Sequence, residues 1–531
     1  MLMKLKDLWK LFTVAFVAVF SFAACSDDDD PEPAPAPVEV VADAKLLTFG
    51  FYKEDNPEYL TRDYIATVPA VVAGTNSYKI EIPMPVTVMK SLLKARFTVN
   101  EGNEVTVNGA VQSSGSTMND FTAGIEYYVK NLTKTQTLRY TITVTKADNM
   151  AWIEQAALDA ALLTGNAEVT GVYSGAVLQV SPKDNKPYVA FGARGVDNKL
   201  CVAKNEGSAW TLVGQPFFTS VVNGSHFDFA IDQDGKPVVA YGDQDATSLK
   251  GALSVMKFDA STWKNVGEQG FFKVQAQYVA LTTLDDMIFA GMINNSNSGD
   301  IARRAMGFAS YQGAAWTTGE SPFLPSGQGV YMVKAGNNAT ATLPAFISIN
   351  RGAVEGVNYG HNVFYRDGAE WKSLLTNFKQ EGATQTSIAA GSFGVTADLN
   401  GNVYVWTGDD ADATGVYQVR LRRYNISANE WTTVGGNTLP IGHDGGFESH
   451  ISLDVAIASD GTPFVAFNNF NDQKKLYVMY LDPDTKQWTT PQQLATDAVD
   501  VNIKFGVNGE GYITYTDSNN KIHLFKYAER Q

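Results

Sequence analysis

Apolar and polar residues alternate in short runs along most of the chain. In the run LRYTITVTK, Tyr140, Ile142 and Val144 alternate with polar neighbours, which is the period of two that half-buried β-strands require. Between residues 44 and 147, similar runs of five to nine residues are separated by Gly, Asn, Ser or Pro. They read LLTFGFY, SYKIEIPMP, KARFTVN, EVTVNGAV, IEYYVKN and LRYTITVTK.

From about residue 170 onward, one unit of about fifty residues recurs, marked by a short turn followed by Trp. The marker reads EGSAWTLVG, DASTWKNVG, YQGAAWTTG, RDGAEWKSL, SANEWTTVG and DTKQWTTPQ. The spacings between these tryptophans are 53, 53, 55, 60 and 57 residues. Their positions are Trp210, Trp263, Trp316, Trp371, Trp431 and Trp488.

Each unit also carries a polar turn followed by an apolar run, as in QDGKPVVAYG and SDGTPFVAFN. A third strand follows, such as LSVMKF, and an apolar run such as FDFAI or LDVAI precedes each turn. Four antiparallel strands per repeat of this length predict a β-propeller. Seven polar turns predict seven blades over residues 150–531; the turns lie near Asn185, Gly235, Asp286, Asn338, Gly401, Gly461 and Gly509.

The last unit stops after its third strand, KIHLFKYAERQ. A closed ring needs its missing outer strand from the start of the domain, which leaves no exposed edge. Trp152 lies 58 residues before Trp210, so its segment is one candidate for that strand. The alternative is that WIEQAALDAALL forms a short helical linker.

The six or seven strands of residues 44–147 predict an immunoglobulin-like β-sandwich. The segments around Phe97, Ser113 and Phe121, with the closing YTITV, resemble the Ig-like domains near the N-terminus of many Bacteroidota surface lipoproteins. The expected fold is therefore all-β, an Ig-like β-sandwich followed by a seven-bladed β-propeller. The resemblance implies that the sandwich is a spacer.

The N-terminus has the layout of a secretory signal peptide, residues 1–24, with three lysines ahead of an apolar run from Leu11 to Ala24. This run is shorter than the ~20 residues of a spanning helix. Phe22, Ala23, Ala24 and Cys25 resemble the bacterial lipobox, although Phe22 stands where leucine is usual. The resemblance implies that Cys25 carries palmitate-type acyl chains as the first residue of the mature chain, which anchor a protein stably.

Residues 25–43 form an acidic, proline-rich linker. Asp27, Asp28, Asp29 and Asp30 resemble the export signal that carries Bacteroidota lipoproteins to the outer face of the outer membrane. The four alternating prolines that follow favour extended polyproline II, a semi-rigid spacer. We therefore expect a lipid-anchored protein of the outer membrane, exposed at the cell surface.

The net charge limits the kinds of partner that the chain can bind, and the cysteine content limits its disulfide bonds and metal sites. The formal net charge is -15, which argues against nucleic acid as a partner and against adhesion to anionic lipid. Besides Cys25 the chain has one cysteine, Cys201. No intramolecular disulfide framework or cysteine metal site follows once Cys25 is acylated, and we expect Cys201, in the apolar run LCVAK, to be a buried structural thiol.

Ligand chemistry is expected on the loops of one propeller face. The longest, GGNTLPIGHDGGFESH, holds His443, Asp444, Glu448 and His450, which offer metal ligands or an acid/base pair. A solvated, glycine-rich loop is the alternative. His226 in NGSHF is expected in a related loop.

The repeated tryptophans are expected to pack between blades, because a residue needed in every blade is most simply structural. Aromatic residues outside that pattern are the better ligand-binding candidates: Tyr278, Tyr331 and Trp406. The cluster Asp409, Asp410 and Asp412 offers oxygen ligands for calcium, but it lacks the spacing of a defined calcium loop, and a solvated turn is the alternative. No other cofactor is expected.

No nucleophile elbow, HExxH, P-loop or dinucleotide motif is present, and the sialidase pattern is matched only by the turn SDGTPF. Catalytic residues are therefore unassigned, and a binding protein is favoured over an enzyme. The expected function is a surface lipoprotein whose propeller binds a glycan or nutrient polymer beside an outer-membrane importer. The alternatives are a propeller glycoside hydrolase or lyase, which would leave no local motif, and an adhesin or protein-binding scaffold.

Overall fold

The computed structural model describes residues 44–133, 135–172, 175–321, 329–336, 343–381, 383, 386–388, 390–410, 417–441, 452–469 and 472–530. Within them the regular secondary structure is almost entirely β-strand, with one short α-helix, α1 (Ala160–Thr164), and a 3₁₀ turn, Ala390–Ser392. None of the helical segments seen there has the length and apolar content needed to span a membrane.

The first hundred described residues form two sheets. One contains β1 (Leu46–Phe51), β2 (Tyr64–Ile65), β4 (Leu93–Val99) and β7 (Met118–Asn119), in the order β2-β1-β4-β7. The other contains β3 (Ser77–Met84), β5 (Asn103–Val107), β6 (Ala110–Val111), β8 (Ile125–Asn131) and β9 (Thr137–Lys146), in the order β3-β9-β8-β5-β6. The predicted strands of this region are therefore present, except that a turn at Asn108 and Gly109 divides the run EVTVNGAV into β5 and β6.

The two sheets face each other through aromatic side chains. Phe49 of β1 meets Tyr127 of β8 edge to face at 5.2 Å between ring centroids, and Phe97 of β4 meets the same tyrosine at 6.0 Å. All three side chains are buried. β3 and β9 pair in parallel, from Ser77 with Arg139 to Met84 with Lys146.

Seven further sheets follow, each built from four main strands. The first sheet contains β11 (Gly171–Val172), β12 (Val177–Val180), β13 (Pro187–Arg194), β14 (Leu200–Asn205) and β15 (Trp210–Leu212). The second contains β16 (Val222–Ile231), β17 (Pro237–Asp243), β18 (Ala252–Asp259) and β19 (Thr262–Asn265). The third contains β20 (Ala276–Leu284), β21 (Met287–Asn294), β22 (Met306–Gln312) and β23 (Ala315–Glu320). The fourth sheet contains β24 (Val330–Gly336), β25 (Ala345–Asn350), β28 (His361–Asp367) and β29 (Glu370–Phe378). A side hairpin of β26 (Ala353–Val354) and β27 (Val357–Asn358) lies between β25 and β28 in the sequence. The fifth sheet contains β30 (Phe393–Ala397), β31 (Val403–Asp410), β32 (Tyr417–Asn425) and β33 (Glu430–Thr433).

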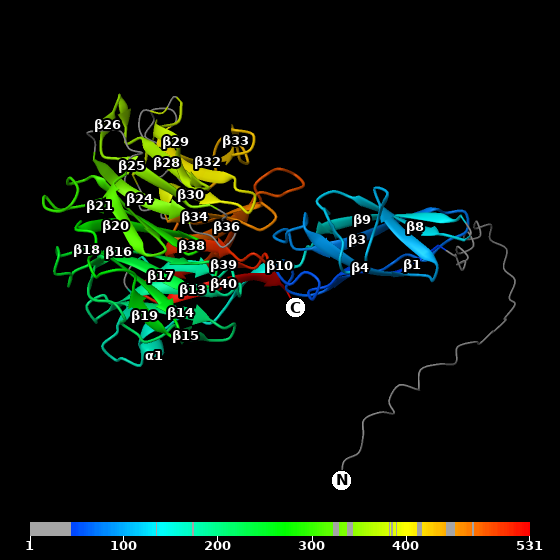
Figure 1. Cartoon of the computed structure of the whole chain (residues 1–531), viewed down its shortest axis with the longest axis horizontal. Helices are drawn as coiled ribbons and strands as arrows, with labels where there is room; N and C mark the ends of the chain where they lie inside the picture. The colour runs from blue at the N-terminus through cyan, green and yellow to red at the C-terminus, as the bar shows by residue number, and fades with distance from the viewer. Residues whose placement is uncertain are drawn as a thin grey trace, which may run out of the picture. The chain divides into compact units, whose positions relative to one another are not determined.

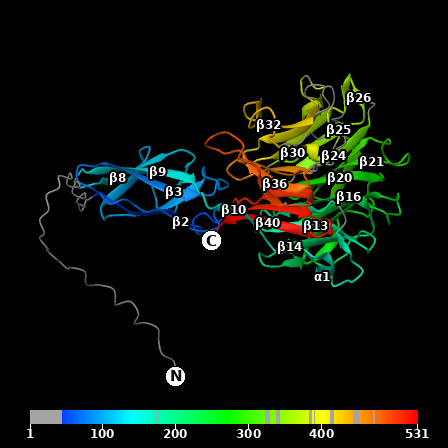
Figure 2. The same ribbon diagram turned by 180° about the vertical axis from the view of Figure 1, so that it is seen from behind.

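The sixth sheet contains β34 (Leu453–Ile457), β35 (Pro463–Asn469), β36 (Lys475–Tyr480) and β37 (Gln492–Ala495). The seventh contains β38 (Val499–Phe505), β39 (Gly511–Thr516), β40 (Ile522–Glu529) and β10 (Met150–Glu154), in the order β10-β40-β39-β38. The strand with Trp152 therefore closes the last sheet, and α1 only follows it. Both views show cyan β10 beside red β40 (Figure 1, Figure 2).

One strand from each of the seven sheets takes part in a closed cycle of contacts. β12 contacts β16, and the contacts continue through β20, β24, β30, β34 and β38 back to β12. We call these seven strands the inner strands and the seven sheets the ring. The chain is thus an all-β protein of many four-stranded antiparallel sheets with a propeller-like arrangement.

Within the described residues, polar turns join inner strands to the second strands of their sheets; the predicted turn near Asn338 lies outside these residues. In the turn DQDGK, the carboxylate Oδ1 of Asp232 accepts a hydrogen bond from the Lys236 N–H at 2.7 Å, and Gly235 has φ +79°. Asp398 accepts in the same way from the Asn402 N–H at 2.9 Å. Both aspartates therefore belong to the polar turns that the sequence predicted near Gly235 and Gly401.

The repeated tryptophans join neighbouring sheets. The indole N–H of Trp263 donates to the Val213 carbonyl at 2.8 Å, and that of Trp316 donates to the Val266 carbonyl at 2.6 Å. Each acceptor belongs to the preceding sheet, so the interpretation of these residues as packing anchors is confirmed. Cys201 is fully buried and unpaired, and burial raises its thiol pKa to about 11, which fits a structural thiol.

Candidate functional site

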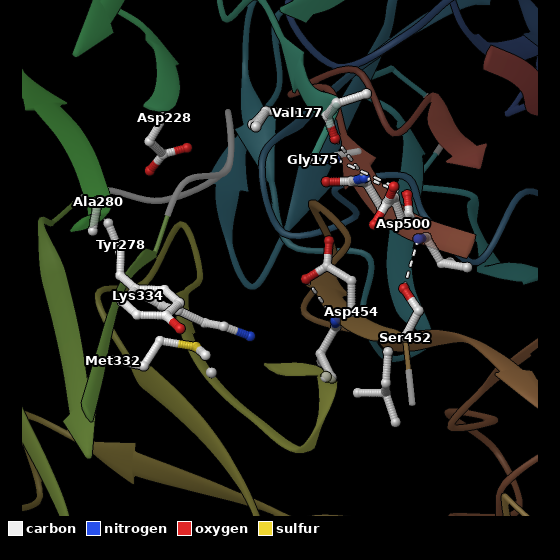
Figure 3. Close-up of a pocket in the computed structure, with 18 of the residues that line it drawn as sticks. Gly175, Val177, Asp228, Tyr278, Ala280, Met332, Lys334, Ser452, Asp454 and Asp500 are labelled. Atoms are coloured by element: carbon white, nitrogen blue, oxygen red, sulfur yellow. Dashed lines mark hydrogen bonds between the residues drawn. The ribbon is translucent and has the colours of Figure 1, made fainter. Parts of the chain in front are cut away.

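The inner strands surround a cavity of about 1070 Å³ at the centre of the ring. All seven inner strands contribute lining residues. This volume suits a ligand the size of a short oligomer. Figure 3 shows the carboxylates of Asp228 and Asp454, the Lys334 ammonium and the Tyr278 ring pointing into the same space.

Three candidate residues from the sequence meet on one wall of this cavity. The rings of His226 and Tyr278 lie 5.4 Å apart, and those of Tyr278 and Tyr331 are stacked at 6.3 Å. They come from the adjacent inner strands β16, β20 and β24. We call His226, Tyr278 and Tyr331 the aromatic wall. His226 was expected in a loop and the tyrosines just ahead of strands, but all three lie within strands.

Irregular strand pairing accounts for the direction of these side chains. The register between β16 and β17 shifts between Val222 and Phe227, and that between β20 and β21 shifts between Gln277 and Ala280. Tyr278 itself has φ +47°, in the left-handed region. An extra residue in one strand bends it and re-aims a side chain, here toward the centre of the ring.

The Tyr278 N–H donates to Nδ1 of His226 at 3.3 Å. Since Nδ1 accepts, a neutral His226 ring carries its proton on Nε2. Burial lowers the pKa of His226 and raises that of Tyr278. At neutral pH this wall is therefore uncharged, and it offers ring faces and hydroxyl groups to a ligand.

Several charged side chains also line the cavity, among many apolar ones. Asp454 Oδ2 accepts from the Lys504 ammonium at 2.6 Å and from the Ile503 N–H at 3.0 Å. Asp228 Oδ2 accepts from the Leu281 N–H at 2.7 Å. Burial raises the pKa of the Asp228 carboxyl to about 7. The backbone N–H groups of Leu281 and Phe229, together with the charge of Lys504, oppose this shift.

Lys334 reaches the cavity from β24. Its ammonium donates to the Phe393 carbonyl at 3.0 Å and lies 4.8 Å from the centre of the Phe393 ring. Burial lowers its pKa to about 8, partly opposed by the charge of Asp454. Asp500 accepts from the Gly175 N–H at 3.2 Å, and burial raises the pKa of this carboxyl.

Trp406 also lines the cavity and is 4% exposed. A Cβ atom at Gly394 would lie 2.0 Å from the Trp406 ring, so only glycine leaves room for the indole there. In the described residues Nε1 of Trp406 has no hydrogen-bond partner. The four aromatic and histidine candidates outside the long loop thus all line one cavity.

The other candidates do not join them in the described structure. His443, Asp444, Glu448 and His450 lie outside the described residues, as do Asp412 and the side chain of Asp410. Asp409 was expected in a turn, but it is the fully buried seventh residue of β31, with Oδ2 accepting from the Thr407 hydroxyl at 3.0 Å. Where the chain is described, no three His, Cys, Asp or Glu side chains are placed to hold a metal. The calcium site stays a prediction.

Sequence reasoning missed the charged lining residues: Asp228, Lys334, Asp454, Lys474, Asp500 and Lys504. The signal for two of them was present, because FDFAI and LDVAI each place an aspartate inside an apolar inner strand. A charged residue in such a run faces either solvent or a polar cavity. These strands were expected only to pack against one another, so their aspartates were not identified as candidate site residues.

No family model matches this chain, and no curated protein matches it. Among solved structures it is similar to an ulvan lyase described as a new family of polysaccharide lyase, with 13% identity, a TM-score of 0.44, and coverage of 68% of this chain and 95% of that one.

It is also similar to the fucose-containing disaccharide complex of a lectin from Aleuria aurantia, with 13% identity, a TM-score of 0.36, and 68% and 96% coverage. A quinoprotein alcohol dehydrogenase-like protein from Bacteroides thetaiotaomicron matches with 10% identity, a TM-score of 0.36, and 80% and 96% coverage. All three TM-scores are below 0.5. None of these likenesses assigns a ligand or a reaction to this chain.

Proposed function

We propose that the chain is a cell-surface lipoprotein of the outer membrane whose central cavity binds a glycan. In this proposal residues 44–147 are an Ig-like spacer and residues 150–531 a seven-bladed β-propeller that works beside an outer-membrane importer. The observation that carries it is the cavity of about 1070 Å³, whose lining combines an aromatic wall with several charged groups.

This combination suits sugars for chemical reasons. Aromatic faces pack against the C–H groups of a pyranose ring, while carboxylates accept hydrogen bonds from hydroxyl groups and ammonium groups donate to ring and hydroxyl oxygens. Tyr278 and Tyr331 supply the faces, and Asp228 and Lys334 supply an acceptor and a donor. A purely apolar ligand would leave these charged groups unsolvated.

Binding is tested with the whole chain purified in detergent and a panel of polysaccharides. We expect retardation in affinity electrophoresis by at least one polysaccharide, with no new reducing ends and no unsaturated product. Tyr278→Ala should weaken retardation, while Tyr128→Ala, at a tyrosine of β8, should leave it unchanged. If no polysaccharide in the panel retards the chain or is cleaved, the glycan proposal fails and a protein-binding scaffold or adhesin replaces it.

A propeller hydrolase or lyase is the second candidate function. Its support is the pKa of about 7 for Asp228 and of about 8 for Lys334 in the same cavity, because groups that titrate near neutrality serve acid-base catalysis. New reducing ends or unsaturated products in the same assay, abolished by Asp228→Asn, would establish this function instead.

The proposed anchor rests on the sequence of residues 1–30. Metabolic labelling with an alkyne palmitate analogue should tag the protein through Cys25. Cys25→Ala should lose the tag and leave the membrane fraction, whereas Cys201→Ala should keep both. A tag that persists in Cys25→Ala would exclude lipidation at this residue.

Surface display and the importer are tested separately. Replacing the four aspartates 27–30 by alanine should keep the lipid tag but protect the protein from protease added to intact cells. Co-purification from detergent-solubilised outer membranes should recover an outer-membrane transporter. Unchanged protease sensitivity would show that these aspartates are not the export signal.

A further inference from the structure

Two aspartates of the ring occupy equivalent positions four sheets apart. Asp228 in FDFAI and Asp454 in LDVAI stand three residues before the end of the inner strands β16 and β34. Each Oδ1 accepts from the N–H of the following residue, at 2.8 Å for Asp228 and 3.0 Å for Asp454. Each Oδ2 accepts from the N–H of a residue on the next inner strand.

Those second donors are Leu281 of β20, at 2.7 Å, and Ile503 of β38, at 3.0 Å. Both donor residues are fully buried. Each carboxylate is therefore held by two backbone N–H groups, one from its own strand and one from the next inner strand. We call this arrangement the carboxylate bracket.

The two brackets differ in one side chain. The residue after Ile503 is Lys504, whose ammonium lies 2.6 Å from Asp454 Oδ2. The residue after Leu281 is Thr282, whose hydroxyl donates to the Gly336 carbonyl at 3.4 Å. In the described part of the chain, no ion pair joins Asp228 to a cation, and the charge that acts on it most is that of Lys504.

Asp228 is nevertheless accessible from the cavity. It is a lining residue of partial exposure, and Figure 3 shows its carboxylate facing the open space above Tyr278. The same space is bordered by His226 on its own strand, by Tyr278 on β20, and across the ring by the Asp454–Lys504 pair. An ionised carboxylate in this partly desolvated position is costly without a positive partner.

We propose that the bracket of Asp228 binds a primary ammonium group supplied by the ligand, and that the glycan of the cavity is an amino sugar with a free amine. The inference rests on the proposed glycan-binding function. The bracket of Asp454 shows within the same molecule which group such a carboxylate accepts. The chain's net charge of -15 also favours the approach of a cation over that of an anion.

The other charges of the cavity are compatible with this placement. Lys504 is paired with Asp454, Lys334 donates to the Phe393 carbonyl, and Asp500 accepts from the Gly175 N–H. Lys474 is a further cation of the lining. The aromatic wall next to Asp228 is uncharged and presents the Tyr278 ring, whose face attracts an ammonium group. The ligand's amine therefore belongs beside Asp228 and its sugar ring beside Tyr278 and Tyr331.

The test compares two ligands on the unaltered whole chain by calorimetry. One is an oligosaccharide of β-1,4-linked glucosamine, and the other is the same oligosaccharide with every amine acetylated, which removes the charge but keeps the sugar backbone. A charge-assisted hydrogen bond is worth about 1.5–3 kcal/mol, so the free amine should bind about tenfold to hundredfold more tightly.

Two variants locate the amine. Asp228→Asn should abolish the preference for the free amine, so that the two ligands bind with the same affinity. Asp500→Asn removes another cavity carboxylate, one that accepts from the Gly175 N–H, and should keep the preference. Circular dichroism of both variants confirms folding before binding is compared.

Equal or tighter binding of the acetylated ligand by the unaltered chain would overturn the inference and leave the proposed glycan binding intact. A preference that survives Asp228→Asn would also overturn it, because the amine would then be bound elsewhere. Binding of an oligolysine peptide, but of neither sugar, would exclude the amino sugar as the ligand. If no glycan of any kind binds, the proposed function fails first and the inference fails with it.

Discussion

The space between the two sheets of residues 44–147 and the centre of the ring are both enclosed by strands, yet they are filled in opposite ways. Between the sheets, Phe51 and Phe121 meet edge to face at 4.8 Å and Phe49 meets Tyr127 at 5.2 Å, all at most 1% exposed. At the centre of the ring, carboxylates and ammonium groups face a cavity.

Geometry explains the difference. Two facing sheets approach to about 10 Å, a gap that apolar side chains fill completely. Seven inner strands arranged in a cycle cannot all meet at its centre, so an open space is left that admits water and ligand. Charged residues can exist there because they stay solvated. The closed interior therefore stabilises the fold, whereas the open interior is available to bind a ligand.

The largest expected effect comes from the closed interior. Phe49→Ala should lower the free energy of unfolding by about 3–5 kcal/mol, because it removes a fully buried ring and leaves a cavity. Chemical denaturation followed by circular dichroism measures this. Glycan binding by the folded fraction should be unchanged; a loss of affinity would show that the sandwich takes part in recognition.

A smaller effect is expected where the ring itself is tightly packed. Gly394→Ala places a Cβ atom about where the Trp406 ring lies, so the indole must move. Overpacking of this kind costs about 1–3 kcal/mol. Since Trp406 lines the cavity, near-ultraviolet circular dichroism should change as well. An unaltered spectrum and stability would contradict the described contact.

The ion pair of the cavity should matter more than one at the surface. Lys504→Met leaves Asp454 without its ammonium partner and should cost about 1–3 kcal/mol in unfolding free energy. Lys236→Met breaks an exposed pair between Lys236 and Asp259, whose side chains are 40% and 47% exposed, and should cost less unfolding free energy than Lys504→Met does. Equal losses in the two variants would remove the distinction between cavity and surface.

The smallest effect concerns pH. Burial raises the pKa of Asp228 to about 7, above the ~3.9 of an unfolded aspartate. The stability that this carboxyl contributes is therefore fully present below about pH 4 and is lost as the pH rises through about 7. Asp228→Asn should flatten the fall in stability over this range by about 1–2 kcal/mol, after allowance for solvent in the cavity.

Denaturant unfolding at a series of pH values measures this slope. Asp234→Asn, in the exposed part of the neighbouring turn, is the matched control and should keep the slope of the unaltered chain. The same slope in Asp228→Asn would show that this carboxyl is not held in a desolvated position.

Much of the fold could be predicted because a β-strand is visible in the local sequence as an alternation of apolar and polar residues. The alternation in LRYTITVTK and the repeated tryptophans near Trp263 and Trp316 fix strands and sheets one by one. The closing role of Trp152 could not be decided, since pairing of β10 with β40 joins residues more than 370 positions apart. Local sequence carries no mark of such a long-range pair.

The candidate site was predicted only in part for the same reason. Tyr278 and Tyr331 stood out because they departed from the repeat, and the structure brings them together. Asp228 and Asp454 were hidden inside regular strands, and their equivalence depends on donors of the next inner strand, Leu281 and Ile503. Loops attract attention in a sequence, whereas here strand residues line the cavity.

The most direct test of the central claim is a crystal structure of the chain with the tightest-binding oligosaccharide from the panel. We predict electron density for the sugar in the central cavity, with a ring against Tyr278 or Tyr331 and a polar group within hydrogen-bond distance of Asp228. Density on the outer surface of the ring or on residues 44–147, with the cavity empty of sugar, would contradict the account.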